Sequence, residues 1–268
     1  MTLATGKEGR CLGLIGGLGP GATVYYYRDL LAAHEAAGRT ARLLIAHADL
    51  NRVRGFAENN ERAGLARYLA AFISSLAAAG AEMTAIVAIT PHICAAELTA
   101  ISPLPLIDIV SEVATAIRVR GLKRIALLGT RFTIESRMFD RLGVDVIMPK
   151  EEEIEQIHNT YMDVLHDRST PAQIDGLRQV ARTLVARDGA EAVLLAGTDL
   201  SMVLNENDAG FPTIDCAAAH IKAIAKGCSI SLSSLRRFGT SPLLRQSFAP
   251  PSRRFEKQGF LIWPKILF

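Results

Sequence analysis

The sequence lacks a hydrophobic run long enough to cross a membrane, because no apolar stretch in its 268 residues approaches the roughly 18 residues that a spanning helix needs. Cysteine is scarce, with four residues and no C-x-x-C or other metal-ligand spacing, so we expect reduced thiols and no metal site. The polar start and the short, glycine-broken apolar stretch after it are typical of a strand and not of a signal peptide. These absences predict a soluble, cytoplasmic protein.

Familiar catalytic motifs are also missing. The chain has no P-loop, no H-E-x-x-H, no G-x-S-x-G and no EF-hand spacing, which removes the chemistries that depend on them. Hydrophobic residues make up 49% and charged residues 21%, with a mean hydropathy of +0.21, so the chain can bury a core and is not disordered. At about 150 residues per domain, its length fits one large domain or two modest ones.

The net charge of +3 conceals a basic C-terminal segment. Residues 228–268 hold seven Lys and Arg and one acid, so this segment carries +6 and the rest of the chain −3. It also holds the only Trp and five of the ten Phe. Such a tail could bind nucleic acid or a membrane, but Gly, Ser and Pro interrupt it and no periodic pattern persists. We therefore expect no nucleic-acid and no membrane partner, and treat the segment as a basic tail whose order the pattern does not fix.

Apolar runs of strand length alternate with amphipathic segments of helix length along the chain. The predicted strands are 11–16, 43–48, 83–89, 106–109, 124–128, 144–148, 192–196 and 212–214. The predicted helices with apolar residues at i, i+3 and i+4 include 62–79, 109–119, 154–166 and 171–187. This alternation predicts an α/β fold with mostly parallel sheets and flanking helices.

A weak internal repeat divides the chain into two similar lobes. Ile15-Gly16-Gly17 matches Leu128-Gly129-Thr130, and Gly80-Ala81-Glu82 recurs as Gly189-Ala190-Glu191 at nearly the same offset. We assign 1–103 with 208–227 to lobe 1 and 104–207 to lobe 2, related by a pseudo-two-fold axis. Because ligands of open α/β sheets bind beyond the carboxyl ends of the strands, the repeat predicts a site in the cleft between the lobes.

A glycine-rich loop follows the first predicted strand. Gly17-x-Gly19-x-x-Ala22 fits a dinucleotide-binding fingerprint, but the acid after the next strand, Asp49, lies 32 residues beyond Gly17, where about 20 is usual. A loop that binds a small carboxylate at a helix N-terminus, or that only makes a tight turn, is the favoured interpretation. Asp49, Asn51 and Arg52 follow the second strand and could line the mouth of the cleft or be solvated loop residues.

Taken together, three motifs resemble the aspartate/glutamate racemase family over roughly residues 11–226. They are the opening Gly16-Gly17-Leu18-Gly19-Pro20-x-Ala22-Thr23, the block 126–133 (A-L-L-G-T-R-F-T) and the closing Pro212-Thr213-Ile214-Asp215. The resemblance implies two α/β lobes, a small amino or dicarboxylic acid as substrate and no cofactor such as pyridoxal phosphate. It implies proton transfer between two cysteines, one at a strand end of each lobe, and by analogy a homodimer.

This sequence departs from the family pattern at both cysteines. Their positions fall on Val87 and Gly197, and the asparagine expected near the first falls on Ile89. The groups that remain are named as candidate site residues. Catalytic candidates are His92 and Asp199; substrate-binding candidates are Gly17, Asn51, Thr90, Thr130 and Thr198.

Each catalytic candidate has a structural alternative. His92 has an ordinary pKa near neutrality and could act as a base, or could simply lie at a helix start. Asp199 could pair with it across the cleft or cap the following helix. Cys94 is interpreted as a small buried hydrophobe, and Cys216 as a less favoured nucleophile.

Three functions are compatible with these residues. The first is a cofactor-independent racemase or isomerase of a small acidic amino acid, of the aspartate or glutamate type, in which groups such as His92 and Asp199 replace the cysteine pair. Its variant is a decarboxylase or isomerase that uses one-sided proton chemistry on a related acid. The second is a non-catalytic protein that binds a small carboxylate. NAD-dependent chemistry is the weakest.

Overall fold

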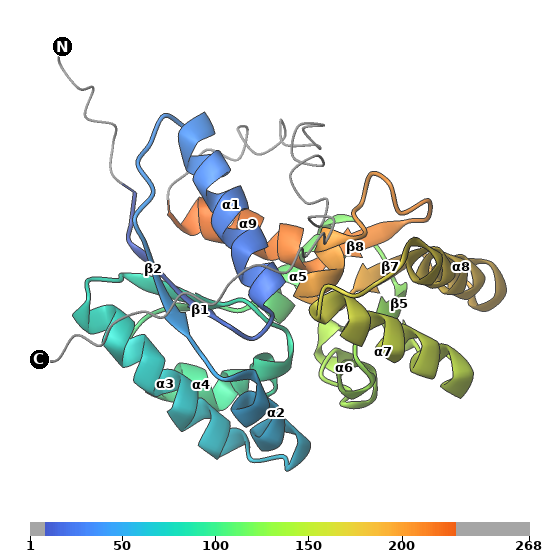
Figure 1. The fold of residues 1–268 in the computed structure, drawn as a ribbon, viewed down its shortest axis with the longest axis horizontal. Coiled ribbons are helices and arrows are strands. Elements are labelled where there is room, and N and C mark those ends of the chain that lie inside the picture. Colours follow the sequence, from blue (N-terminus) through green and yellow to red (C-terminus); the bar gives the residue numbers. More distant parts are fainter. Residues whose placement is uncertain (1–8, 229–268) are drawn as a thin grey trace, which may run out of the picture. The chain divides into compact units, whose positions relative to one another are not determined.

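The computed structural model describes residues 9–228, which form two parallel four-stranded sheets flanked by helices (Figure 1). The predicted α/β fold is thereby confirmed. The part of the basic tail from residue 229 onward lies outside the described residues. No helix within residues 9–228 is both long and apolar enough to span a membrane.

The first sheet has the strand order β2-β1-β3-β4. Its strands are β1 (Leu12–Gly16), β2 (Leu43–His47), β3 (Met83–Ile86) and β4 (Leu106–Ile107). The helices of this lobe are α1 (Pro20–Ala36), α2 (Leu50–Glu58), α3 (Arg62–Ala78), α4 (Ala95–Ile101) and α9 (Cys216–Gly227), with the 3-10 helix η1 (Thr90–Cys94). Side chains of β1 alternate between the two faces, so that Leu12 and Leu14 pack with α1 and α9 while Ile15 packs with α3.

The second sheet repeats this order as β6-β5-β7-β8. Its strands are β5 (Arg124–Leu128), β6 (Asp145–Ile147), β7 (Ala192–Leu195) and β8 (Thr213–Asp215). The remaining elements are α5 (Ile109–Val119), α6 (Arg131–Glu135), α7 (Glu151–Leu165) and α8 (Pro171–Asp188), with the 3-10 helices η2 (Asp140–Leu142) and η3 (Thr198–Met202). Apolar residues of β5, β7, α5, α7 and α8 form one core.

The repeat detected in the sequence corresponds to a repeated hydrogen bond. Glu82, just before β3, accepts the backbone N–H of Cys11 at the start of β1 (2.6 Å). Glu191, just before β7, accepts the N–H groups of Lys123 and Arg124 at the start of β5 (2.5 and 3.1 Å). In both sheets one carboxylate therefore ties together the two central strands at their N-terminal ends.

The lobe boundaries lie later than the sequence suggested. We placed the crossings at 103/104 and 207/208, but β4 belongs to the first sheet and β8 to the second. The chain crosses between lobes at Asp108 and Asp215, and each of these side chains caps the helix that follows, by accepting the N–H groups of Val110 and Ala218 respectively (both 3.0 Å). The two helices so started, α5 and α9, pack against each other at the junction (Figure 1). Both strands were predicted, but strands of two and three residues carry too little pattern to show to which sheet they belong.

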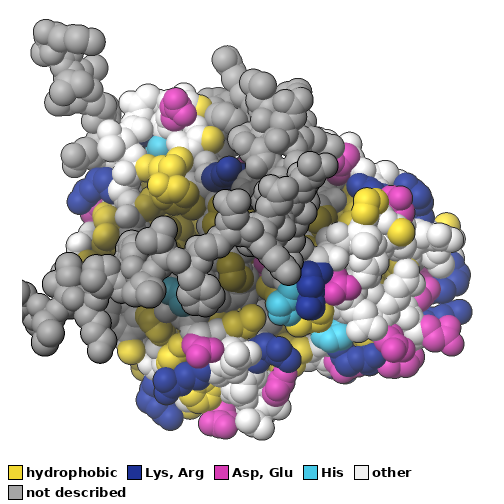
Figure 2. Space-filling view, viewed as in Figure 1, with side chains coloured by type: hydrophobic (Ala, Val, Ile, Leu, Met, Phe, Trp, Pro, Cys, Tyr) yellow, Lys and Arg dark blue, Asp and Glu magenta, His cyan; other side chains and the backbone are white. Residues whose placement is uncertain are grey.

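Acidic and basic side chains are interspersed on the described part of the face seen in Figure 2. Ion pairs among the described residues include Arg187 with Glu153 at 2.8 Å and Arg131 with Glu135 at 2.8 Å. The second pair joins residues one helical turn apart and gives Arg131 a structural partner at the edge of the second lobe.

Candidate active site

A small cavity of about 100 Å³ lies where the strand-end loops of the two lobes face each other. This volume is well below the roughly 300–1,000 Å³ of pockets for drug-sized ligands, so the cavity suits a small molecule. The first lobe contributes Leu18, Leu50, Val53, Arg54, Ala57, Glu58, Ala88, Ile89, Thr90 and Pro91. The second contributes Thr130, Phe132, Thr133, His158, Tyr161, Met162, Leu165, Ala196, Thr198 and Asp199.

Threonines hold the glycine turns in shape in both lobes. In the first lobe the hydroxyl of Thr23 accepts the N–H of Gly17 (3.0 Å) and donates to the carbonyl of Gly19 (3.1 Å). In the second, Thr130 caps α6 by accepting the N–H of Thr133 at 3.1 Å. The glycine-rich loop, whose sequence fits a dinucleotide-binding fingerprint, therefore has a local structural role: Thr23 stabilises its turn.

Asp199 is the most heavily buried ionisable group in the cavity wall, with 2% of its surface exposed. Its Oδ2 accepts the hydroxyl hydrogen of Tyr161 (3.0 Å), and its Oδ1 has no hydrogen-bond partner among the described residues. Burial raises the pKa of Asp199 from 3.8 to about 6, although the Tyr161 hydroxyl and the N–H of Ala22 oppose this rise. A carboxyl group that titrates near neutral pH can both accept and donate a proton.

Asp199 also lies against the glycine loop of the first lobe. A Cβ atom at Gly19, the residue before α1, would be only 2.5 Å from Oδ1 of Asp199. Glycine is therefore needed at position 19 to let the carboxyl of one lobe approach the helix start of the other. The positive end of the α1 dipole favours a negative charge at this place.

Tyr161 fills the space next to Gly197, where the resemblance placed the second cysteine. A Cβ atom at Gly197 would overlap Cε2 of the ring and lie 2.6 Å from its Oη. Tyr161 was not among the predicted site residues, because the amphipathic pattern of α7 predicts the helix but not which of its residues reaches a strand-end loop.

The position of the first cysteine needs a correction. Val87 is fully buried in the core with Leu12 and Leu14 and does not line the cavity, whereas its neighbour Ala88 does. Because successive residues of an extended chain point to opposite faces, the choice of register decides which residue reaches the site. Within the described residues, the first-lobe loop that follows β3 presents Ala88, Ile89, Thr90 and Pro91 to the cavity, none of which is ionisable.

His92 lies beneath the site and is not among the residues that line the cavity. Its ring is buried, with Nδ1 2.9 Å from the carbonyl of Ala88 and Nε2 3.9 Å from Oδ1 of Asp108. Burial lowers the pKa of His92, and Asp108 only partly offsets this. The pairing with Asp199, one of the two alternatives, is not formed: His92 contacts Ala88 and Asp108, and Asp199 accepts a hydrogen bond from Tyr161.

Of the five expected binding residues, Thr90, Thr130 and Thr198 line the cavity, and Gly17 and Asn51 do not. Gly17 adopts a positive φ of 83° next to Ala48 and donates to Thr23. Asn51 is exposed in the first turn of α2, where its N–H and that of Arg52 are capped by Asp49.

None of the four cysteines lines the cavity, and all four are buried. Burial raises the pKa of Cys94 to about 12 and that of the Cys216 thiol well above its ordinary value. These thiols remain protonated at neutral pH and cannot act as thiolate bases.

Three further ionisable groups line the cavity that sequence reasoning did not select. Arg54 and Glu58 pair with each other on the exposed side of α2 at 3.5 Å. His158 of α7 accepts the N–H of Arg131 through Nδ1 (3.3 Å), and burial lowers its pKa. His158 and Asp199 both belong to the second lobe.

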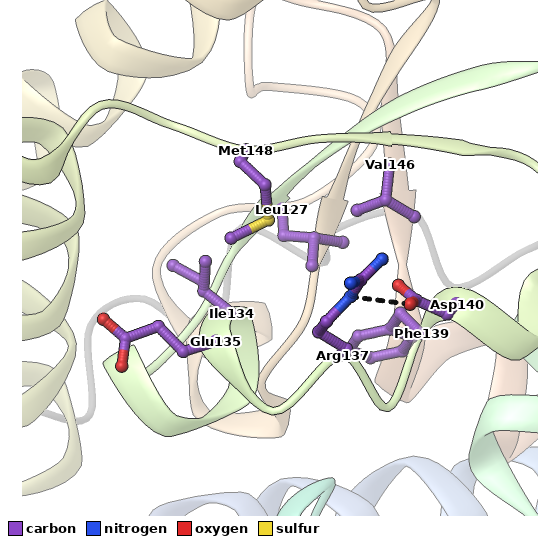
Figure 3. Close-up of a pocket in the computed structure, with 8 residues that line it drawn as sticks. All are labelled: Leu127, Ile134, Glu135, Arg137, Phe139, Asp140, Val146 and Met148. Atoms are coloured by element: carbon purple, nitrogen blue, oxygen red, sulfur yellow. Dashed lines mark ion pairs between the residues drawn. The ribbon is translucent and has the colours of Figure 1, made fainter.

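A larger hollow of about 450 Å³ lies wholly within the second lobe. Figure 3 shows Leu127, Ile134 and Met148 pointing toward one another, while Arg137 and Asp140 form an ion pair (2.8 Å) at one side. Its lining is mostly apolar and includes no residue of the first lobe. The smaller cavity is therefore the stronger candidate site, because polar groups from two sets of strand ends converge on it.

The fold is that of a two-lobed α/β protein with a small cavity at the paired strand ends. The sequence profile of the Asp/Glu/Hydantoin racemase family matches residues 15–224, so the chain belongs to that family.

Solved structures agree with this assignment. A candidate Asp/Glu racemase from Yersinia pestis is 28% identical with a TM-score of 0.72, over 82% of this chain and 99% of that one. An aspartate racemase homologue from Pyrococcus horikoshii is 25% identical with a TM-score of 0.70 and the same coverage. The aspartate racemase of Picrophilus torridus, at 20% identity and a TM-score of 0.66 over 85% and 98% of the two chains, shares the fold.

Proposed function

We propose that the protein is a cofactor-independent enzyme that moves a proton on a small acidic amino acid, of the aspartate or glutamate type, bound in the cleft between the lobes. The observation that carries this proposal is Asp199. It lines the cavity, its buried Oδ1 has no hydrogen-bond partner among the described residues, and burial raises its pKa to about 6. Proton transfer is most efficient when the pKa of the acid–base group lies near the working pH.

The proton is exchanged from one wall of the cleft. On the opposite side the loop after β3 offers only Ala88, Ile89, Thr90 and Pro91, and the one carboxyl among the first-lobe residues that line the cavity, Glu58, is paired with Arg54 on the exposed side of α2. Inversion of a stereocentre by two bases requires an ionisable group on each face of the substrate. Isomerisation can instead return the proton from the side that took it, and decarboxylation needs a single acid to protonate the carbanion that loss of CO2 leaves. One-sided chemistry therefore agrees better with these walls than two-base racemisation.

Substrate binding is assigned to hydroxyl groups at equivalent strand ends. Thr90 follows β3, Thr198 follows β7 and Thr130 follows β5, and all three line the cavity. Hydroxyl groups can donate hydrogen bonds to a ligand carboxylate. Arg54 at the exposed side supplies a positive charge that could turn from Glu58 to a second carboxylate.

A second candidate function is binding without catalysis. It is favoured by the apolar character of Ala88 and Ile89 in the first-lobe wall. A binder would be stabilised against thermal unfolding by a small acid but would leave the Cα–H bond intact.

Proton NMR in D2O distinguishes these functions. The protein is incubated with each enantiomer of aspartate and glutamate and with related dicarboxylic acids, and the Cα–H signal is followed together with the stereochemistry. Exchange with retention, or formation of an isomer or decarboxylated product, supports the proposal. Exchange with inversion would contradict the one-sided mechanism, and stabilisation without exchange would favour the binder.

A further inference from the structure

Glycine at position 197 makes room for Tyr161. The backbone of Gly197 is extended, with φ −170° and ψ 126°, a conformation that any residue can adopt. Its lack of a side chain is therefore explained by space: a Cβ atom would overlap Cε2 of Tyr161 and lie 2.7 Å from its Cζ. The Tyr161 ring and a side chain at position 197 would occupy the same space. With the ring in this place, the residue at 197 on the strand-end loop must therefore be glycine.

The tyrosine that occupies this space is hydrogen-bonded to Asp199. The residue is 7% exposed, and its hydroxyl donates to Oδ2 of Asp199 at 3.0 Å. Burial raises the pKa of Tyr161 well above its ordinary value of 10, so the phenol stays neutral and acts as a donor. One carboxyl oxygen is thus fixed, and the other, Oδ1, is buried against Gly19 without a hydrogen-bond partner among the described residues.

We propose that Tyr161 is the positioning residue of the second-lobe wall: admitted by the glycine at 197, its hydroxyl holds Oδ2 of Asp199 and so fixes the carboxyl in the cavity wall, with Oδ1 against Gly19 at the start of α1. This inference rests on the proposed function of Asp199. A hydroxyl that donates to a carboxylate also favours its ionised form. Tyr161 therefore sets both the orientation of the carboxyl and the pH at which it can accept a proton.

Other titratable groups around Asp199 do not supply this hydrogen bond. Cys216 of α9 and Tyr26 of α1 have pKa values that burial raises well above their ordinary ones, so both are neutral at pH 7. From α1, the N–H of Ala22 favours the ionised carboxyl. Of the other ionisable residues of the cavity wall, Arg54 and Glu58 pair with each other, and His158 is bonded to the N–H of Arg131.

The first arm of the test removes only the hydroxyl. Tyr161→Phe keeps the ring that fills the space beside Gly197, so the fold should be retained. The pKa of Asp199 is measured by carbon NMR of labelled aspartate, with the signal assigned by its loss in Asp199→Asn. We expect this pKa to be higher in Tyr161→Phe than in the wild type, and the acidic limb of the rate profile to move to higher pH by the same amount. Tyr27→Phe, which alters an exposed tyrosine of α1, should change neither.

The second arm tests the steric exclusion and needs no activity. Gly197→Cys should lower the melting temperature, whereas Gly55→Cys should not, because a Cβ at Gly55 meets nothing within 4 Å. Tyr161→Ala should lower the melting temperature much less when it is added to Gly197→Cys than when it is made alone. In the double variant, the new thiol should react with a reagent small enough to enter the cleft. If Gly197→Cys alone does not fold, the test is whether the double variant with Tyr161→Ala does, as relief of the steric conflict predicts.

The outcomes separate the two proposals. An unchanged Asp199 pKa in Tyr161→Phe, or a Gly197→Cys protein as stable as the wild type, overturns the positioning role. A raised pKa and a steric conflict in a protein that exchanges no proton would uphold the placement of Tyr161 and reject the catalytic function instead.

Discussion

Replacing Asp199 by asparagine should change how the stability of the protein depends on pH. Burial raises the pKa of Asp199 from 3.8 to about 6 in the folded protein, whereas in the unfolded chain the group titrates near its ordinary value. The folded state therefore binds this proton more tightly than the unfolded state does. The resulting stability is fully present below about pH 3.8 and is lost as the pH rises through about 6.

The magnitude follows from the two pKa values. One pKa unit corresponds to about 1.4 kcal/mol, so the whole interval is worth about 3 kcal/mol. Asparagine cannot ionise. The unfolding free energy of Asp199→Asn, relative to wild type, should therefore improve by about 2–3 kcal/mol between about pH 4 and about pH 8. Asp215, whose pKa burial also raises to about 6, is present in both proteins and cancels.

Urea unfolding followed by circular dichroism at both pH values measures this difference. Asp175→Asn is the matched control, because the side chain of Asp175 is 72% exposed on α8 and should give the same small difference at both pH values. A stability difference for Asp199→Asn that does not depend on pH would refute the inferred pKa and with it the proposed acid–base role.

Two further predictions follow from packing around the site. Gly19→Ala should lower the unfolding free energy by about 1–3 kcal/mol, because the added methyl group would lie 2.5 Å from Oδ1 of Asp199. Gly55→Ala, where a Cβ meets nothing within 4 Å, should instead raise the unfolding free energy by about 0.5–1 kcal/mol. Thermal denaturation compares the two variants. All four cysteines are buried, so the native protein should not react with a thiol-specific chromophore until denaturant is added, and alkylating reagents should leave turnover unchanged; rapid labelling of the native protein would contradict their placement.

The fold could be predicted from the sequence because its signals are local and repeated. Buried parallel strands appear as short apolar runs, and every predicted strand corresponds to one in the structure. The paired Gly-Ala-Glu motif marks the glutamates that tie the central strands of each sheet, Glu82 and Glu191. The lobe boundaries were placed too early because β4 and β8 are too short to be assigned to a sheet by pattern alone.

Part of the site could also be predicted from the sequence. Parallel strands end at the same edge of their sheet, so Thr90, Thr130, Thr198 and Asp199 could be expected beside one another, and all four line the cavity. Tyr161 could not be found in this way, since it reaches the site from the middle of a helix. His92 was selected for its chemistry, but its ring turns under the loop toward the carbonyl of Ala88, and sequence spacing does not encode that rotation.

The most direct test of the central claim is the rate at which deuterium replaces the Cα proton of aspartate or glutamate in D2O, compared between the wild type and Asp199→Asn. We predict that the wild type catalyses exchange, that Asp175→Asn retains it, and that Asp199→Asn loses about 100-fold or more, as expected when a general acid–base group is removed. Exchange by Asp199→Asn at the wild-type rate would contradict the assignment of Asp199 as the proton-transfer group.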